Sequence, residues 1–598
     1  MTTIESSTDV FAGLGRPDVN VDVLVIGAGP AGLTASLALA RDGVSALTVT
    51  KYPGTANSPR AHITNQRTME VLRDLGVEEQ VRAVAVPNEL MGHNVWATSF
   101  AGQEIARLMT WGSGVERHHE YQKASPSEMC NIPQHILEPE LRDAALDQGA
   151  DIRFSSEMVG IRQDDDGVDV VVQDRDSGAR QLVRAKYVIA ADGGRSRAAE
   201  LLDFPFRGES NLGAAVSVWI EADLTKYTEH RPGTLYWMTQ PGNDYWVGSG
   251  TWICVKPWTE WVLLFMYDPA EGEPDLSEEA LRARAHTTIG DPDIDVRIKS
   301  VGTWQINHVV AERYSIGRVF LAGDAAHRHP PANGLGTNTS IQDAYNLCWK
   351  LKMVLEGVAG TELLETYHLE RQPIGEQVVD RAMKSVADML PISQAIGVEP
   401  GQSPEEGWAR LHHLFSSEEG APERRRKLDE AIQLQNYQFN ALGVEIDQRY
   451  QHGALVNDGE PWDEGSVDPE LHHRPTTHAG ARLPHAWIEH KRTRLSTLDI
   501  GASQFRLFTG RTGQMWIDAA ARAGKAIGID VPVFQLGRSC EYDDVYLSWE
   551  KVREVGDDGV ILVRPDGHVA WRAHKMPVDP EAELTAALAA TLAVDVND

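Results

Sequence analysis

The chain has 598 residues, of which 42% are hydrophobic and 24% are charged. This length is more than one hydrophobic core usually serves, and the composition is that of a folded protein, so we expect about two to four folding units. The 87 acidic residues outnumber the 56 basic ones and give a net charge of −31. Because such a field repels phosphate groups, the sequence argues against binding to nucleic acid or to a membrane surface and favours a small-molecule partner.

Cysteines and apolar runs bear on the cellular compartment. The chain has four cysteines, Cys130, Cys254, Cys348 and Cys540. They lie far apart and form no metal-ligand spacing, which is typical of reduced thiols and predicts no metal site. Residues 1–20 lack the basic flank and apolar core of a signal peptide, and no later apolar run is long enough to span a bilayer. We therefore expect a cytoplasmic protein.

The first predicted unit is a βαβ motif. Residues 21–26 are an aliphatic run typical of a buried parallel strand, residues 33–40 form a helix, and residues 46–50 form a second strand. Between the first strand and the helix lie the glycines of a GxGxxG pattern, Gly27, Gly29 and Gly32. The first allows a tight turn, the second lets the backbone approach a pyrophosphate, and the third lets helix and strand pack closely. This context predicts nucleotide binding.

The end of the second predicted strand departs from the usual pattern. A dinucleotide-binding fold usually places Asp or Glu there to bind the adenosine ribose. Here the position is Thr50, followed by Lys51. Because Thr50 can form a hydrogen bond but carries no charge, we expect weaker binding at the adenosine end, or binding by other groups.

Further along the chain, two regions are predicted to be rich in strands. Residues 153–190 are predicted as a β-meander whose last strand leads to Asp192. Residues 206–305 contain strand-like segments rich in tryptophan and predict a second sheet.

The segment 317–355 returns to an α/β pattern. A short strand delivers Asp324 at its carboxyl end, where ligands bind in α/β sheets. A loop of residues 330–337 follows, and a helix is predicted to begin near Ser340, so that an anion or a ring system could rest on its N-terminus. The alternative is an ordinary turn in which Asp324 only caps the helix.

The motifs named so far resemble, in combination, those of the FAD-dependent aromatic hydroxylases, which are single-component flavoprotein monooxygenases. They are the GxGxxG turn, the DG pair Asp192 and Gly193, and the GD pair Gly323 and Asp324 followed by HRHPPANGLGTN. The resemblance extends from about residue 20 to the C-terminus. Within the family, residues 48–76 and 124–139 are most similar to hydroxylases of chlorinated phenols.

The resemblance implies an α/β fold in which a Rossmann-type FAD-binding domain is interleaved with a β-sheet domain that binds the substrate. The expected parts are residues 20–205 for the first part of the FAD-binding domain, 206–305 for the substrate-binding sheet, and 306–450 for the second part with a helical region. Residues 451–480 are expected to be a linker. Residues 481–598 resemble a thioredoxin-like domain that lacks CxxC, so disulfide exchange within it is excluded.

The resemblance also implies roles for single residues. Asp324 would bind the ribitol of FAD, and Asp192 with Gly193 would serve both FAD and the nicotinamide donor. The carbonyl of Pro331 would face the oxygenated flavin. The further positions expected to contact FAD are Gly27, Gly29, Gly32, Thr50, Arg60, Gln134, Gly323, Gly334, Gly336 and Asn338.

Structural alternatives exist for three of these side chains. Asp192 could only cap a turn, Arg60 could be a solvent-facing charge, and Gln134 could pack between domains.

The implied reaction uses the flavin for the difficult step. Hydride from NADPH or NADH reduces FAD, O2 adds to the ring, and the resulting hydroperoxide transfers one oxygen atom to the position ortho to a phenol hydroxyl, giving a catechol. In phenol hydroxylases a carboxylate thought to deprotonate the substrate stands at the position of His62. We therefore predict that His62 is the base, the alternative being a structural histidine between strand and helix.

The tryptophan-rich region suggests a wall of the substrate site. Because successive residues of a strand face opposite sides, only about half of its aromatic side chains can face a ligand. The candidates are Tyr236, Tyr245 and Trp246. The substrate is expected to be a phenol, with chlorophenols among the candidates, and the protein is expected to be a homodimer or homotetramer.

Two alternatives stay open at this point. The same scaffold could hydroxylate a carboxylated or larger phenol, such as a hydroxyphenylpropionate or a polyketide. The chain could also be a FAD-fold binding protein without redox function.

Overall fold

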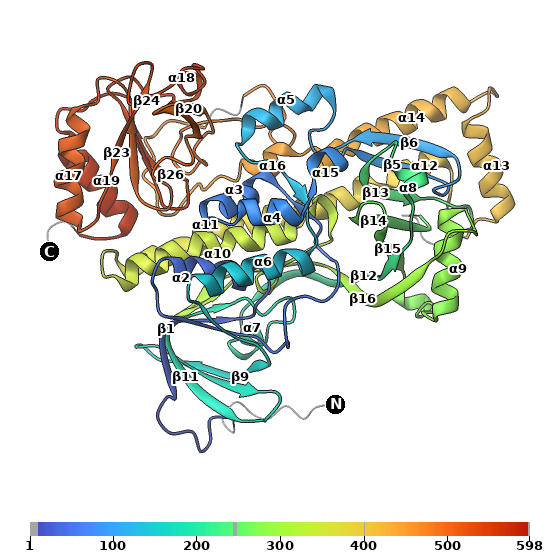
Figure 1. Cartoon of the computed structure of the whole chain (residues 1–598), viewed down its shortest axis with the longest axis horizontal. Coiled ribbons are helices and arrows are strands. Elements are labelled where there is room, and N and C mark those ends of the chain that lie inside the picture. Colours follow the sequence, from blue (N-terminus) through green and yellow to red (C-terminus); the bar gives the residue numbers. More distant parts are fainter. Residues whose placement is uncertain (1–9, 243–247, 400, 463–464, 596–598) are drawn as a thin grey trace.

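The computed structural model describes residues 10–242, 248–399, 401–462 and 465–595 (Figure 1). Its first domain is built on an eight-stranded sheet with the order β17-β18-β11-β1-β2-β8, and β9 and β10 extend it beside β11. β1 (Val19–Ile26) pairs in parallel with β2 (Ala46–Val49) on one side and with β11 (Arg180–Ala190) on the other. The other strands are β8 (Asp151–Arg153), β9 (Ser156–Gln163), β10 (Val168–Asp174), β17 (Ser315–Ile316) and β18 (Val319–Leu321).

The predicted βαβ unit is confirmed. Helix α2 (Pro30–Arg41) connects β1 to β2, and Pro30 stands in its first turn, where no backbone N–H is needed. The helix is buried along most of its length because α10 (Leu335–Leu355) and α6 (Gln134–Asp147) both pack against it. This packing leaves the N-terminus of α2 at the edge of the sheet where β1 ends.

A second sheet has eight strands in the order β19-β16-β12-β15-β14-β13-β5-β6. Five strands and helix α9 (Glu278–Ile289) come from the region that was expected to form it. These strands are β12 (Phe206–Glu221), β13 (Gly233–Met238), β14 (Gly250–Lys256), β15 (Glu260–Tyr267) and β16 (Arg297–Ala311). The other three, β5 (His93–Ala97), β6 (Glu104–Met109) and β19 (His327–Arg328), come from outside it, so the two domains share chain segments.

A small sheet joins the two domains. β3 (Ile63–Thr64) and β4 (Val86–Pro87) both pair with β7 (Cys130–Asn131) in antiparallel fashion. Helix α3 (Gln66–Asp74) begins directly after β3, and the side chain of Asn65 caps it by accepting a hydrogen bond from the Thr68 N–H.

Helix α10 begins earlier than predicted. The sequence placed its start near Ser340, because Asn and Gly residues before it are typical of loops. In the structure Asn333 and Gly334 have φ angles of 63° and 65°, and the helix starts at Leu335. Gly336 therefore lies in the first helical turn, where backbone N–H groups have no partner within the helix.

Helices form most of the region that follows α10. They are α11 (Glu365–Asp388), α12 (Leu390–Ile396), α13 (Pro404–Leu414), α14 (Ala421–Leu434), α15 (Asn436–Phe439) and α16 (Leu442–Ile446). The remaining short helices of the first two domains are α4 (Glu78–Val84), α5 (Val115–Ala124), α7 (Arg197–Leu201) and α8 (Thr225–Thr228). Residues 451–480, expected as a linker, contain neither helix nor strand in the part that is described.

The C-terminal domain is a separate α/β unit beside α10 (Figure 1). Its seven-stranded sheet has the order β21-β20-β24-β23-β22-β25-β26. The strands are β20 (Trp487–His490), β21 (Thr493–Ser496), β22 (Arg506–Thr509), β23 (Val533–Gly537), β24 (Tyr542–Asp543), β25 (Val560–Val563) and β26 (Val569–Ala573). Helices α17 (Met515–Ile527) and α19 (Pro580–Leu592) pack together, and α18 (Trp549–Val552) is short.

The α/β fold class expected from the sequence is therefore confirmed. None of the described helices combines the length and the apolar character that crossing a bilayer requires.

Gly32 tests how tightly the βαβ unit is packed. A Cβ atom at this position would lie 1.9 Å from the carbonyl oxygen of Gly27. We expect Gly32→Ala to destabilise the protein by about 1–3 kcal/mol, because strand and helix must move apart. Thermal unfolding measures the effect. The matched control is Gly302→Ala, since a Cβ on Gly302 meets nothing within 4 Å; equal melting temperatures for the two variants would contradict the close packing.

Candidate active site

Three turns from distant parts of the chain meet at one edge of the first sheet. The Ala191 N–H donates to the Ile26 carbonyl at 2.8 Å, and the Ala322 N–H donates to the Ala190 carbonyl at 3.0 Å. β1, β11 and β18 run parallel to one another, so their carboxyl ends lie at the same edge. The GxGxxG, DG and GD motifs are thereby brought together.

The glycines of these turns allow the close approach. A Cβ on Gly27 would lie 2.1 Å from the Ala191 carbonyl oxygen, and its φ of 107° is unfavourable for other residues. A Cβ on Gly323 would lie 3.3 Å from the Cβ of Ala31 in helix α2. Beside Gly193, in contrast, a Cβ would meet nothing within 4 Å. The turns are therefore packed against each other, with open space next to the DG pair.

The two carboxylate oxygens of Asp192 differ in their surroundings: one caps a helix, and the other has no hydrogen-bond partner among the described residues. Its Oδ2 accepts hydrogen bonds from the N–H groups of Arg197 and Ala198 at 2.7 and 3.2 Å, at the start of α7. Its Oδ1 is buried and has no hydrogen-bond partner among the described residues. Burial raises the pKa of this carboxyl group. The capping alternative thus accounts for one oxygen and leaves the other free to bind a ligand.

Asp324 and Arg60 lie near each other although they are far apart in the sequence. The Asp324 side chain is accessible to solvent, and yet surrounding protein raises its pKa, an effect that His327, Arg328 and Arg60 oppose. Arg60 is itself exposed, and its positive charge opposes the rise in the pKa of Asp324.

Gln134 contacts Glu138, a residue that the sequence did not indicate and that lies beside the GxGxxG turn. Its Nε2 donates to Glu138 Oε1 at 2.5 Å, and Glu138 Oε2 accepts from the Ala56 N–H at 2.5 Å. A Cβ on Gly29 would lie 3.9 Å from Glu138 Oε1, so this carboxylate faces the turn. Glu138 belongs to no motif, and only the packing of α6 against α2 brings it there.

Thr50 is more enclosed than a ribose contact requires. It is 6% exposed, its N–H donates to the Arg153 carbonyl at 3.0 Å, and its Oγ1 accepts from the Tyr52 N–H at 3.5 Å. Its role at the adenosine end stays a prediction.

The loop before α10 is held by the side chain of Asn338. Asn338 Nδ2 donates to the carbonyls of Ile63 and Gly334 at 2.8 and 2.6 Å, and its Oδ1 accepts from the Asn65 N–H at 3.0 Å. The side chain thus connects this loop to β3 and α3, and any contact of Asn338 with a ligand is left to its backbone. Pro331, in the same loop, is exposed.

His329 is a further candidate for a ligand contact. It lies in the segment HRHPPANGLGTN, and the sequence motif alone gave it no role. Its Nδ1 is 2.6 Å from the Pro330 carbonyl oxygen, and burial lowers the pKa of the ring to about 4. The neutral ring therefore carries its proton on Nδ1 and presents Nε2 as an acceptor. Nε2 is buried without a partner among the described residues, and a Cβ on Gly336 would lie 3.6 Å from it.

His62 lies where the small sheet meets the second sheet. Its carbonyl accepts from the Ile132 N–H at 2.8 Å, and Asn131 Nδ2 donates to the carbonyl of Cys254 in β14 at 2.8 Å. Burial, and then the charge of His135, lower the pKa of His62 to about 4. The ring is therefore neutral near pH 7, and its Nδ1 has no partner among the described residues.

Strand alternation decides which aromatic residues of β13 face this region. Tyr236 is fully buried between the sheet and α9, and its hydroxyl donates to the Arg231 carbonyl at 2.8 Å. The structure thus places Tyr236 in the core between the second sheet and α9, and its contact with a substrate stays a prediction. Its neighbour Trp237 shares an apolar cluster with Ile63 and Trp96, and it stacks on Trp96 with ring centroids 6.3 Å apart. The other two candidates, Tyr245 and Trp246, lie outside the described residues.

Comparison with known proteins places the chain in a family. Residues 20–382 match the FAD binding domain family, and residues 476–593 match the C-terminal domain of aromatic-ring hydroxylases. The chain belongs to the FAD-dependent aromatic hydroxylases. It is 45% identical to 2,4-dichlorophenol 6-monooxygenase of Delftia acidovorans, over 96% of this chain and 99% of that protein. It is 43% identical to phenol 2-monooxygenase of Pseudomonas sp. (strain EST1001), over 95% of this chain and 92% of that protein.

A solved structure agrees with this assignment. The crystal structure of the flavin-dependent monooxygenase PieE in complex with FAD and substrate matches with a TM-score of 0.94 at 46% identity. The match covers 97% of this chain and 100% of that chain. This hydroxylase is therefore a FAD-dependent monooxygenase, and the alternative of a binding protein without redox function is excluded.

The hydroxylase's own residues fit a bound FAD. Several buried polar atoms without a hydrogen-bond partner among the described residues lie on the turns that meet at the sheet edge or on the loop before α10. They are Asp192 Oδ1, Arg328 Nε, His329 Nε2 and Asn333 Oδ1. A ligand with phosphate, hydroxyl and ring-nitrogen groups would satisfy donors and acceptors of this kind. The open space beside Gly193 lies among them.

Asp324 tests the FAD site directly. We expect Asp324→Asn to raise the FAD dissociation constant of the apoprotein about tenfold or more, because a hydrogen bond to a charged acceptor contributes about 1.5–3 kcal/mol. Titration of apoprotein with FAD, followed by flavin fluorescence, measures this. Asp176→Asn, in an exposed turn, is the control. Equal FAD affinity of the two variants would show that Asp324 does not hold the cofactor.

Proposed function

We propose that this hydroxylase inserts one oxygen atom ortho to the hydroxyl group of a phenol and forms a catechol. Two electrons come from NADPH or NADH, one atom of O2 enters the ring, and the other leaves as water. Chlorophenols are included in the proposed substrates, because one of the relatives named above is a dichlorophenol monooxygenase. Bound FAD supplies the redox chemistry that activates O2.

The observation that carries the proposal is the state of His62. It is a neutral, buried imidazole with an unpartnered Nδ1, next to the loop that Asn338 holds. A phenol whose hydroxyl donates to this nitrogen would share its proton with His62 in the transition state, and this makes the phenol ring more electron-rich; with a pKa of about 4 the imidazole does not take the proton of the unreacted phenol outright. The cluster of Ile63, Trp96 and Trp237 would exclude water from the ring and hold its plane.

The position of the buried arginines favours a phenol without a carboxylate. A carboxylated substrate would need an arginine that faces it. Among the described residues, the arginines with fully buried side chains are Arg371, Arg506 and Arg564, and they lie between α10, α11 and the C-terminal domain. Each of the other buried arginines pairs with a carboxylate of the protein: Arg67, Arg231, Arg381, Arg482, Arg553 and Arg572.

Substrate choice can be tested with a panel of phenols. We expect the purified, FAD-loaded protein to oxidise NADPH or NADH and to consume O2 when phenol or chlorophenols are added, with one catechol formed per nicotinamide oxidised. Hydroxyphenylpropionate and a hydroxybenzoate serve as carboxylated controls. Catechol formation from the carboxylated compounds alone would overturn the proposal.

His62→Ala should change the pH dependence as well as the rate. We expect a loss of about 10²-fold at pH 7, as is typical for removal of a general base. Since the pKa of His62 is about 4, the wild-type base is active throughout pH 6–8. The variant depends on phenolate formed in solution, so its rate rises with pH towards the pKa of the substrate, which for phenol is near 10.

The same variant separates the substrates. His62→Ala should lose less activity towards a chlorophenol than towards phenol. The chlorine substituents lower the pKa of the phenol hydroxyl, so more of the chlorophenol is already ionised. His490→Gln, in the C-terminal domain, is the control. A pH profile that keeps its shape, with equal losses for both substrates, would remove the role of base from His62.

We also infer a homodimer or homotetramer in the cytoplasm. Light scattering of the purified protein and fractionation of the source cells test these two points.

A further inference from the structure

A network of buried charges enters the FAD-binding domain from the C-terminal domain. Arg564, which follows β25, donates to both oxygens of Glu370 on α11, at 2.6 Å to Oε1 and 2.9 Å to Oε2. Lys350 of α10 donates to Glu370 Oε2 at 2.7 Å. Arg564 also pairs with Asp566, at 3.0 Å from Nε to Oδ1. All four side chains are at most 1% exposed.

The next residue of α11 continues the network towards the GD turn. Arg371 Nε donates to Asp343 Oδ1 at 2.8 Å. The second oxygen of Asp343 accepts hydrogen bonds from the Gly323 N–H at 3.0 Å and from His327 Nε2 at 2.8 Å. Asp343 therefore holds the residues on both sides of Asp324, the expected partner of the FAD ribitol.

The two halves of the network are also connected through side chains. Asn346 Nδ2 donates to Glu370 Oε2 at 2.7 Å and lies 3.5 Å from the hydroxyl oxygen of Tyr450. Arg371 Nη1 lies 3.3 Å from the same hydroxyl oxygen. The ring of Tyr450 stacks on His568 of the C-terminal domain with centroids 4.4 Å apart. A buried polar path therefore runs from Arg564 to Gly323.

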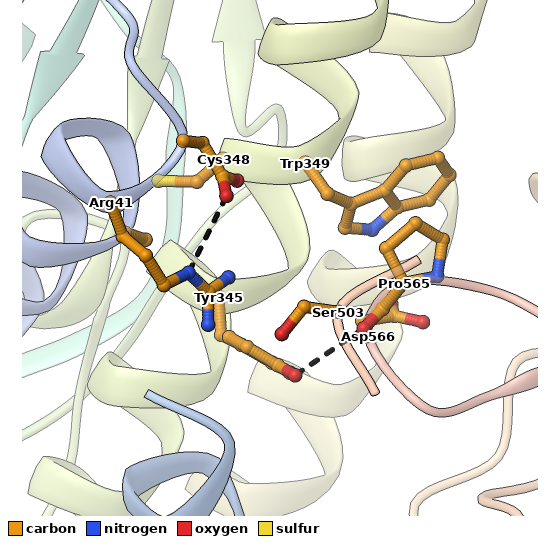
Figure 2. Close-up of a pocket in the computed structure, with 9 residues that line it drawn as sticks. Arg41, Tyr345, Cys348, Trp349, Ser503, Pro565 and Asp566 are labelled. Carbon is orange, nitrogen blue, oxygen red and sulfur yellow. Dashed lines mark hydrogen bonds and ion pairs between the residues drawn. The ribbon is translucent and has the colours of Figure 1, made fainter. Parts of the chain in front are cut away.

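The loop that carries Arg564 also contacts the other side of the site. The Asp566 carbonyl accepts from Arg67 Nη2 of α3 at 2.9 Å, and the Pro565 carbonyl accepts from the Tyr345 hydroxyl at 3.4 Å. Pro565 and Asp566 line, together with Tyr345 and Trp349, a cavity of about 10 Å³, which has room for roughly one water molecule. Figure 2 shows these side chains around it. Helix α3 follows the segment of His62 and Ile63, so the loop that carries Arg564 contacts both α10 and the helix next to His62.

Burial makes the network sensitive to the loss of a single member. Burial would raise the pKa of Glu370, but Arg564 and Lys350 lower it to about 2. Removing one partner of a buried ion pair leaves an uncompensated charge, and the neighbours must rearrange to meet it. A rearrangement of Glu370 on α11 would displace Arg371, and with it Asp343 and the GD turn.

We propose that Arg564 is a positioning residue for FAD: through Glu370, Arg371 and Asp343, the C-terminal domain holds the GD turn in the geometry that binds the cofactor. This role gives the thioredoxin-like domain, which lacks CxxC, a part in the flavin site. It rests on FAD binding by this family and not on the phenol proposed as substrate.

A double-mutant cycle on FAD affinity tests the proposal. Arg564→Met and Asp343→Asn are made singly and together, and apoprotein is titrated with FAD. We expect each single variant to raise the FAD dissociation constant at least tenfold, and the double variant to raise it by much less than the product of the two factors. Arg564 and Asp343 do not contact each other in the described network, so non-additivity would report the path between them.

A control separates positioning from simple loss of domain stability. Asp499→Asn breaks a salt bridge between the domains, to Arg73 at 2.6 Å, without touching the network. We expect it to lower the melting temperature and to leave the FAD dissociation constant within threefold of wild type. The visible circular dichroism of the bound flavin should change in Arg564→Met and not in Asp499→Asn.

Two results would overturn the proposal. One is a folded Arg564→Met protein with the FAD affinity and flavin spectrum of Asp499→Asn. The other is a double variant whose effect equals the product of the single effects. If Arg564→Met does not fold, the same cycle is run with Arg564→Lys, which keeps one positive charge facing Glu370, and the same two results decide.

Discussion

The parallel pairing of β1, β11 and β18 is the constraint on which the rest of this structure depends. Parallel strands end at a common edge, and there the turns that follow them must lie side by side. Only glycine allows this, because a Cβ on Gly27 would overlap the carbonyl oxygen of Ala191. Motifs some 300 residues apart, such as Gly27 and Asp324, thereby form one site.

Sharing of chain segments joins the cofactor region to the substrate region. β19, which begins three residues after Asp324, is an edge strand of the second sheet, and β5 and β6 complete the other edge. A shift of the GD turn would therefore move the edge strand of the second sheet as well. The buried charges between α10, α11 and the C-terminal domain extend this connection to a third unit. The folding units of the hydroxylase are thus joined by a shared sheet and by buried ion pairs.

The sequence alone supported the fold class, the βαβ unit and the three glycine-bearing motifs, because each depends on residues that are neighbours along the chain. It did not indicate what each face of β13 packs against, since alternation fixes that Tyr236 and Trp237 face opposite sides but not which of them meets α9. It also placed the start of α10 too late. Glycine and asparagine are typical of loops, and the sequence did not show that Gly336 already belongs to the first turn of the helix.

What the sequence determined by itself is therefore local: the backbone freedom of its glycines, the aliphatic strands, and a set of motifs specific enough to indicate a flavin hydroxylase. Tertiary structure alone decided the rest. It brought Glu138 close to Gly29 and paired Arg564 with Glu370. It also buried His62 beside β14, which lowers the pKa of the ring. The physical reason is that burial, charge pairing and the direction of a side chain are properties of neighbours in space, and these neighbours lie tens to hundreds of residues apart in the chain.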